Sequence, residues 1–160
     1  MDLNKNLNDV VNLLINNGKT IAIAESCTGG FISHMITNIP GASKTFDRGF
    51  VCYSNEAKID VINVEPEVIK KFGAVSEEVA RQLAYNVRIL SNVDIGIGIT
   101  GIAGPTGGTP EKPVGLVYIG ISTEEDTIVE KNIFQTDRIN FKAKVLERVL
   151  QLIKKKLEEY

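Results

Sequence analysis

Hydrophobic residues recur along the chain at two spacings, one typical of helices and the other of buried strands. Apolar side chains every three or four residues from Leu3 to Ile15 predict an opening amphipathic helix, and Gly18 is a plausible stop. The apolar run at 20–24 predicts a short buried strand. A second helical pattern begins at Gly29-Gly30 and runs to about residue 38, where "IPGAS" breaks it.

The middle of the chain alternates in the same way. The segment 45–54 predicts a strand, and the pattern becomes helical again from Asn55. Pro66 suits the first turn of a helix and Gly73 the end of one, so a short helix is expected between them. Ser76 is placed to cap the next helix, whose first turn contains two glutamates and whose apolar face runs to Leu90.

Three further strands are expected at 94–100, 114–122 and 127–134, and a long helix follows from about Asp137. Helices that alternate with buried strands favour a sheet covered on both faces. We therefore expect an α/β fold, a three-layer α/β/α sandwich with a mixed sheet of about five strands, formed by residues 1–160 as a single domain.

Charge and composition exclude several classes of protein. A formal net charge of -2 over 160 residues provides no basic field that would hold nucleic acid. No apolar run approaches the length of a membrane span, and the polar N-terminus lacks the apolar core of a signal peptide. Cys27 and Cys52 are not spaced as a CxxC pair and are expected to be free thiols. We expect a cytoplasmic protein.

The stretch "GIGITG" at 96–101 matches the glycine pattern of dinucleotide-binding proteins. That pattern requires a helix to begin at the third glycine, whereas "IAGPTGGTPEKP" follows here and cannot be helical. The segment 100–113 is instead a long loop at the carboxyl end of a central strand, where ligands usually bind in α/β sheets. Its amides and side-chain donors suit an anion, and the alternative is an ordinary surface connection.

The stretch "AESCTGG" at 24–30 places Ser26 and Cys27 between a strand and a helix. The start of that helix offers free N–H groups suited to an oxyanion or a phosphate. The alternative is that Ser26 or Thr28 only caps the helix. A serine nucleophile also needs a base. His34 is the only histidine, and its position inside the helical pattern favours a structural or surface residue.

Other serine enzymes use a lysine as the base, provided that burial or neighbouring charge keeps it partly neutral. Lys58 is the natural candidate, because it lies in the first turns of the helix after "VCYS", five residues beyond Tyr53. Both side chains can then point toward the same edge of the sheet. The alternatives are a solvated lysine and a packed tyrosine.

Four stretches together resemble the CinA C-terminal domain family, whose stand-alone members are nicotinamide-nucleotide amidases. They are "AESCTGG", "RGFVCYSNEAK", "GAVSEEVA" and "TGIAGPTGGTPEKPVGLVYIG". The resemblance implies hydrolysis of the carboxamide of nicotinamide mononucleotide, which yields nicotinate mononucleotide and ammonia. It implies Ser26 as the nucleophile, with Tyr53 and Lys58 completing the catalytic set, and no cofactor or metal.

The same resemblance indicates where the substrate, a small-molecule nucleotide, is held. The expected binding residues lie in the matching stretches and at the start of the last helix: Thr28, Gly29, Gly30, Arg48, Asn55, Thr100, Gly101, Gly104, Pro105, Lys112 and Arg138. Amides near Thr28 to Gly30 are the expected oxyanion donors. The family pattern F-x-G-D-R-x-x-x-R is only partly kept in "FQTDRINFK", where Lys142 replaces the second arginine. Because lysine cannot bind a phosphate with two parallel hydrogen bonds, a role for Lys142 is open.

Family resemblance further implies a dimer or higher homo-oligomer, with no nucleic-acid or membrane partner. Many relatives carry a nucleotide-processing domain before this one, and the chain is expected to be the stand-alone form. Two alternative functions stay open from the sequence. One is a nucleotide-binding or regulatory module without turnover, and the other is a partner domain for a separately encoded CinA-like protein.

Overall fold

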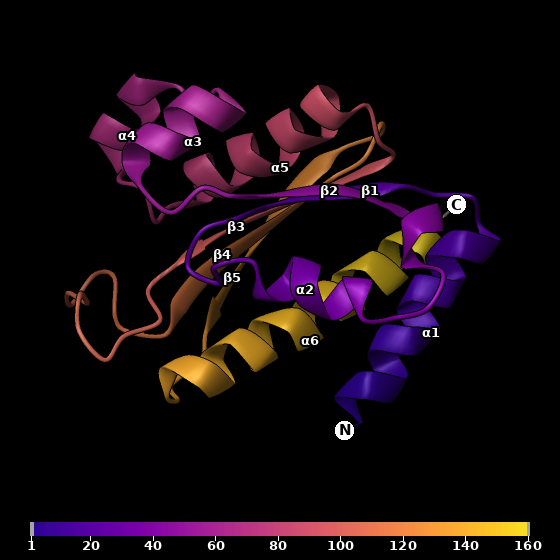
Figure 1. Ribbon diagram of the computed structural model, residues 1–160. Helices are drawn as coiled ribbons and strands as arrows, with labels where there is room; N and C mark the ends of the chain where they lie inside the picture. The colour runs from indigo at the N-terminus through magenta and orange to yellow at the C-terminus, as the bar shows by residue number, and fades with distance from the viewer. Residues whose placement is uncertain (1, 160) are drawn as a thin grey trace.

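The computed structural model describes residues 2–159 and contains a five-stranded sheet between two layers of helices (Figure 1). The helices within this range are α1 (Leu3–Asn16), α2 (Phe31–Thr37), α3 (Asn55–Ile62), α4 (Pro66–Phe72), α5 (Glu77–Ser91), α6 (Arg138–Glu158) and the short 3-10 helix η1 (Ala42–Lys44). The strands are β1 (Ile21–Glu25), β2 (Phe46–Val51), β3 (Ile95–Gly101), β4 (Leu116–Ser122) and β5 (Thr127–Ile133). The predicted three-layer α/β/α architecture is confirmed.

The strands are arranged in the order β2-β1-β3-β4-β5. Strand β1 runs parallel to both β2 and β3, whereas β4 is antiparallel to β3 and to β5. The sheet is therefore mixed, as predicted. Because three neighbouring strands are parallel, the ends of β1, β2 and β3 meet at one edge, and the loops that follow these strands are brought together there.

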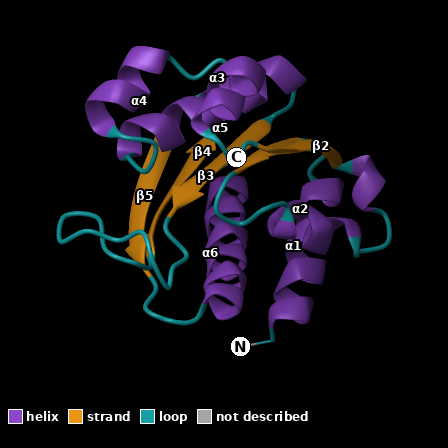
Figure 2. Ribbon diagram, turned by 60° about the vertical axis from the view of Figure 1, so that its left-hand side comes forward, coloured by secondary structure: helices purple, strands orange, loops and turns teal. Residues whose placement is uncertain are grey.

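Each face of the sheet has its own hydrophobic core, and helices cover both faces (Figures 1 and 2). Helices α1, α2 and α6 cover one face, where Ile23 and Ile97 are fully buried. Helices α3, α4 and α5 cover the other face, where Ala22 and Ala24 of β1 are buried. Alternate side chains of one strand thus supply both cores, as the period of two requires.

Two element boundaries differ from the prediction for local reasons. The strand expected at 45–54 ends at Val51, because Ser54 caps α3 by accepting a hydrogen bond from the Ala57 amide at 3.0 Å. The helix expected from Gly29 begins at Phe31, since Gly29 and Gly30 have φ values of 61° and 95°, outside the helical region. Ser76 caps α5 as predicted and accepts from the Val79 amide at 3.2 Å.

The glycines of "GIGITG" allow α5 to pack directly against the sheet backbone. A Cβ atom added at Gly96 would lie 2.2 Å from the Ala84 carbonyl oxygen, and one at Gly98 would lie 2.4 Å from the Ala84 nitrogen. Gly120, which pairs with Gly98 across β3 and β4, faces Ala80 in the same way at 2.6 Å. No helix begins at Gly101, so the glycine pattern serves helix-sheet packing and not a dinucleotide.

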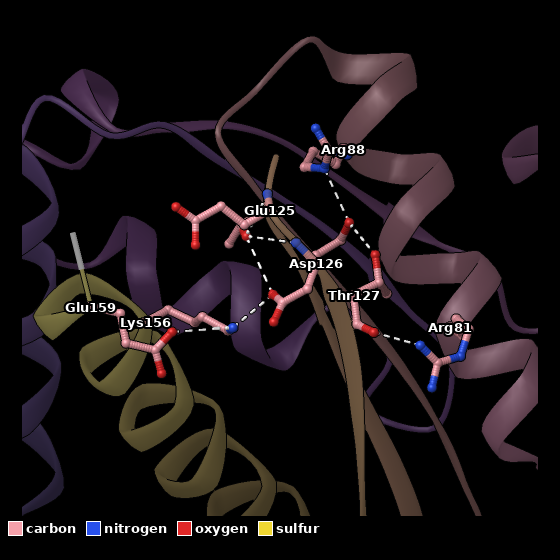
Figure 3. A network of polar contacts seen from close by, with 9 residues as sticks. Arg81, Arg88, Glu125, Asp126, Thr127, Lys156 and Glu159 are labelled. Carbon is pink, nitrogen blue, oxygen red and sulfur yellow. Dashed lines mark hydrogen bonds and ion pairs between the residues drawn. The ribbon is translucent and has the colours of Figure 1, made fainter.

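A polar network fastens the turn between β4 and β5 to the helices on both faces (Figure 3). Lys156 of α6 contacts Asp126 at 2.7 Å and Glu159 at 3.3 Å, and the Arg88 Nε of α5 donates to Ser122 Oγ at 3.0 Å. Because Ser122 pairs with Gly96 at the start of β3, this network lies at the end of the sheet away from the β1, β2 and β3 loops.

Candidate active site

A cavity of about 280 Å³ opens where the loops after β1, β2 and β3 meet the start of α6. It is lined by Ser26, Cys27, Tyr53, Asn55, Lys58, Ala74, Val75, Thr100, Gly101, Ile102, Ala103, Gly104, Thr106, Gly107 and Arg138. The structure therefore brings together the three residues that the sequence predicts as catalytic, Ser26, Tyr53 and Lys58. Carboxyl ends of strands in such sheets are the usual place for a ligand.

A larger hollow, of about 510 Å³, lies on the outer side of α5 and is lined by residues that include Arg81, Tyr85 and Ile89. Its lining contains neither a serine nor a cysteine, and the amide of Asn86 within it already donates to the Ile62 carbonyl at 2.9 Å. The smaller cavity is therefore the better place for nucleophilic chemistry.

Lys58 is buried with an exposed fraction of 2%, although it lies near the start of a surface helix. It shares the inward face of α3 with Ile62, four residues later, which is also buried. Its Nζ donates to the backbone carbonyl oxygens of Cys52 at 3.0 Å, Tyr53 at 3.1 Å and Ser54 at 3.5 Å. The alternative of a solvated helix lysine is wrong.

Burial lowers the pKa of Lys58 below its ordinary value, and the thiols of Cys52 and Cys27 partly oppose this effect. Among residues 2–159, no carboxylate forms an ion pair with its Nζ. A buried lysine of this kind can lose its proton more readily than a surface lysine. It therefore meets the requirement for a lysine acting as a general base.

The thiol of Cys27 lies in the same turn but does not have the chemistry of a nucleophile. Burial raises the pKa of Cys27 to about 12, and the nearby charge of Glu25 adds to the increase. The thiol therefore stays protonated near neutral pH, whereas the reactive form of cysteine is the thiolate. Cys52 is more deeply buried than Cys27, and burial raises its pKa too. The hydroxyl of Ser26, which has an exposed fraction of 7% and lines the cavity, is therefore the candidate nucleophile of this turn.

Tyr53, from the segment between β2 and α3, and Asn55, the first residue of α3, also line the cavity. Tyr53 is 64% exposed, so its ring is not packed into a core. Its backbone carbonyl accepts a hydrogen bond from Lys58 Nζ at 3.1 Å. Tyr53 thus lines the cavity and also holds the lysine through its backbone.

The long loop after β3 forms one wall of the cavity through Gly101 and Gly104. Thr100 also lines it, but its hydroxyl donates to the Ala74 carbonyl at 2.8 Å and so fastens the segment before α5. Pro105 lies outside the lining. Lys112 also lies outside it, because its Nζ donates to the Phe72 carbonyl at 2.6 Å and caps the end of α4.

Among the basic residues predicted to bind the substrate, only Arg138 lines the cavity, where it begins α6. Arg48 is exposed on the edge strand β2, forms an ion pair with Asp47 and does not line the cavity. Lys142 follows Arg138 by one helical turn. Its Nζ would lie 3.7 Å from a Cβ added at Gly29, and its charge acts on the thiol of Cys27.

The turn from Thr28 to Gly30 was expected to contact the substrate, but it does not line the cavity. Neither glycine is part of the lining, and the buried Thr28 hydroxyl donates to Glu25 Oε1 at 2.6 Å. The Gly29 amide donates to the Ser26 carbonyl at 3.1 Å. The alternative that Ser26 or Thr28 caps α2 is also wrong, since the N-cap position is Gly30. His34 is exposed on α2 outside the cavity, in agreement with the predicted surface position.

Sequence reasoning missed Glu25 and the pair Ala74 and Val75. The pair lines the cavity because Thr100 holds it there, and no pattern in the sequence indicates that contact. Glu25 did carry a signal, because it is a charged residue at the end of an otherwise apolar strand. Such a residue is fully buried only when several hydrogen bonds compensate for its charge.

Two further findings concern residues 2–159. No helix in this range has the length and apolar character to cross a membrane. No group of three or more histidine, cysteine, aspartate or glutamate side chains is arranged to hold a metal ion there.

Comparison with known proteins gives consistent matches. The model of the CinA C-terminal domain matches residues 3–157. A CinA-like protein of Kosmotoga olearia is 48% identical over 148 residues, which are 92% of this chain and 36% of that protein. The chain thus spans about a third of the length of this relative.

Solved structures extend the likeness to the whole fold. The competence/damage inducible protein CihA from Agrobacterium tumefaciens is 33% identical with a TM-score of 0.93, over 99% of this chain and 96% of that one. A competence-damaged protein (CinA) superfamily protein from Klebsiella pneumoniae is 28% identical with a TM-score of 0.96, over 100% of both chains.

Proposed function

The chain belongs to the CinA C-terminal domain family, and on that premise we propose that it is an amidase that hydrolyses the carboxamide of nicotinamide mononucleotide. The products are nicotinate mononucleotide and ammonia. One observation carries the proposal: a buried lysine without a carboxylate partner lines the same cavity as a nearly buried serine. The family includes amidases, and this pair supplies the nucleophile and the base that amide hydrolysis requires.

In the proposed first step, Ser26 Oγ attacks the carbonyl carbon of the carboxamide while Lys58 Nζ, in its neutral form, accepts the hydroxyl proton. Within residues 2–159, no hydrogen bond joins these two groups, since Nζ is held by three carbonyls. The contact to the Ser54 carbonyl, at 3.5 Å, is the longest of the three and so the weakest. It is the contact that Nζ gives up when it turns toward Ser26.

The attack produces a tetrahedral intermediate with a negative oxygen. The amides of Ile32 and Ser33 already donate to Glu25, and that of Gly29 donates to Ser26 itself. We assign the oxyanion to the amide of Cys27, the residue that follows the nucleophile, which is where strand-turn-helix hydrolases place such a donor. This assignment replaces the expected site at Thr28 to Gly30.

Collapse of the intermediate breaks the carbon-nitrogen bond. Lys58 returns its proton to the departing nitrogen, Tyr53 assists this transfer, and ammonia leaves. The nicotinoyl group is then an ester on Ser26. Water attacks the ester, and Lys58 accepts a proton from the water and passes it to Ser26 Oγ as the ester bond breaks. The carboxylic acid that forms releases its proton to solvent and leaves as the carboxylate.

The substrate also carries a 5′-phosphate, and we assign its recognition to Arg138 at the mouth of the cavity. A guanidinium group can form two parallel hydrogen bonds to a phosphate. Lys142, one turn further along α6, adds a positive charge near the Ser26 turn. Asn55, Gly101 and Gly104 remain as contacts for the ribose or the ring.

A chromatographic assay of products tests this function. Incubation with nicotinamide mononucleotide should yield nicotinate mononucleotide, and free nicotinamide should react far more slowly because it cannot contact Arg138. Equal turnover of both compounds would contradict the assignment of the phosphate, and turnover of neither would contradict the proposed activity.

A further inference from the structure

Glu25 is a completely buried carboxylate at the end of β1, next to Ser26 in the chain. Its Oε1 accepts hydrogen bonds from the Thr28 hydroxyl at 2.6 Å and the Ile32 amide at 3.0 Å. Its Oε2 accepts from the amide of Ser33 at 2.8 Å and from the hydroxyl of the same residue at 2.6 Å. The catalytic steps proposed above do not use this residue.

We propose that Glu25 is a positioning residue that fixes the direction of the Ser26 side chain. The inference rests on the proposed function, in which Ser26 is the nucleophile. Glu25 precedes Ser26 directly, and Thr28 follows it by two residues. One carboxylate therefore anchors the chain on both sides of the nucleophile and fastens the turn to the first residues of α2.

The local sequence explains why a carboxylate is needed there. The N-cap position of α2 is Gly30, which has no side chain to accept a hydrogen bond from the helix. The first amides of a helix have no partner within it, and they favour a negative charge. Glu25 supplies that charge from the neighbouring strand. The same hydrogen bonds therefore compensate for the burial of its carboxylate and give the first amides of α2 an acceptor.

Strand β2 is adapted to the same arrangement. A Cβ atom at Gly49 would lie 2.4 Å from Ser33 Oγ and 3.2 Å from Ser33 Cβ. Any larger residue at this position would displace Ser33 from the carboxylate. The glycine in the edge strand therefore leaves the space that Ser33 needs in order to reach Glu25.

This arrangement also decides what the start of α2 can bind. Because the amides of Ile32 and Ser33 already hold an internal carboxylate, a phosphate or carboxylate of the substrate cannot use them. The role of this helix start is then to hold the nucleophile in place and not to bind the substrate.

Two substitutions at Thr28, one that removes the hydroxyl and one that keeps it, test the proposal. Thr28→Val keeps the shape of the side chain and removes its hydrogen bond to Glu25, whereas Thr28→Ser keeps the bond. We expect Thr28→Val to lower kcat for nicotinamide mononucleotide by about tenfold to a hundredfold, the size of effect produced by a misplaced reacting group. KM should change little, and Thr28→Ser should restore most of kcat.

A matched control is available at the other end of β1. Thr45 is also buried, and its hydroxyl donates to the Lys19 carbonyl at 2.6 Å. Thr45→Val removes an equally short bond far from Ser26, so it should lower the melting temperature without the loss of kcat. Hydrogen exchange of the amides at residues 26–33 should accelerate in Thr28→Val and in Glu25→Gln, and not in Thr45→Val.

The inference is overturned if Thr28→Val and Glu25→Gln lower the melting temperature but leave kcat and exchange at 26–33 unchanged. A different result would mean that the proposed function fails.

If the wild-type protein produces no nicotinate mononucleotide, the amidase proposal fails. The exchange rates, together with the rate at which a fluorophosphonate labels Ser26, then decide the role of Glu25, because Thr28→Val must accelerate exchange and slow the labelling.

Discussion

Lys58 lines the same cavity as Ser26, and both side chains are almost completely buried, with exposed fractions of 2% and 7%. The serine reaches the cavity from the end of β1, and the lysine reaches it from the inward face of α3. They meet because β1 and β2 are parallel neighbours, so the turn after β1 and the helix that follows β2 begin at the same edge of the sheet. The proposed amide hydrolysis requires both residues, because it needs a nucleophile and a base together.

The first prediction concerns the base. Lys58→Met removes the amine, and Lys58→Arg keeps a charge but introduces a guanidinium that is not deprotonated in proteins. Both variants should lower kcat about a hundredfold or more, the usual contribution of general-base catalysis. Steady-state ammonia release measures the loss. Substantial activity in Lys58→Arg would contradict a role for the neutral amine.

The dependence of the wild-type rate on pH has a definite sign. Burial lowers the pKa of Lys58 from the ordinary value of 10.5. The neutral form of Lys58 becomes more abundant as pH rises toward this lowered pKa. The value of kcat/KM should therefore increase with pH and level off above a midpoint that lies below 10.5. An ascending limb that persists unchanged in Lys58→Met would show that another group is titrating.

The third prediction concerns the neighbouring thiol. Because burial raises the pKa of Cys27 to about 12, its thiol is almost entirely protonated at pH 8. Alkylation of Cys27 by iodoacetamide, followed by mass spectrometry of the folded protein, should be far slower than alkylation of the same residue after unfolding in urea. Rapid labelling of the folded protein would show that the thiolate is present after all.

The fourth prediction tests the packing of α5. Gly98→Ala places a Cβ 2.4 Å from the Ala84 nitrogen and 2.6 Å from Leu83 Cβ, so the helix must move away from the sheet. We expect a loss of about 1–3 kcal/mol in the free energy of unfolding, the usual cost of overpacking. Urea unfolding monitored by circular dichroism measures it.

Gly18→Asn is the control for that experiment. Gly18 has a φ of 63° and no neighbouring atom within 4 Å, and asparagine tolerates this backbone conformation. The change should alter the free energy of unfolding by less than about 1 kcal/mol. Equal losses at Gly18 and Gly98 would contradict the role of close packing.

Much of the fold could be predicted from the sequence, because its elements have strong periodicity. The alternation of buried strands and amphipathic helices indicated the three layers, and Ser76 and Gly73 marked helix ends correctly. The sequence pattern does not predict the end of a strand or helix where a local hydrogen bond decides it. The strand before α3 ends early because Ser54 caps that helix, a choice that apolar periodicity does not reveal.

Prediction of the site from the sequence was uneven for a similar reason. Residues at strand ends, such as Ser26 and Tyr53, lie at the cavity because topology places them there. Lys112 and Arg48 do not, since each is held by a local partner, the Phe72 carbonyl and Asp47. The turn after Ser26 does not bind the substrate as predicted, because Glu25 accepts the hydrogen bonds of Thr28 and of the Ser33 amide. These residues show no regular spacing in the sequence that would reveal the contact.

The most direct test of the central claim compares Ser26→Ala with Cys27→Ala in an assay of ammonia release from nicotinamide mononucleotide. Circular dichroism establishes that both variants are folded. We predict that Ser26→Ala abolishes measurable turnover and that Cys27→Ala keeps activity of the same order as the wild type. Turnover that persists in Ser26→Ala and disappears in Cys27→Ala would contradict the serine mechanism.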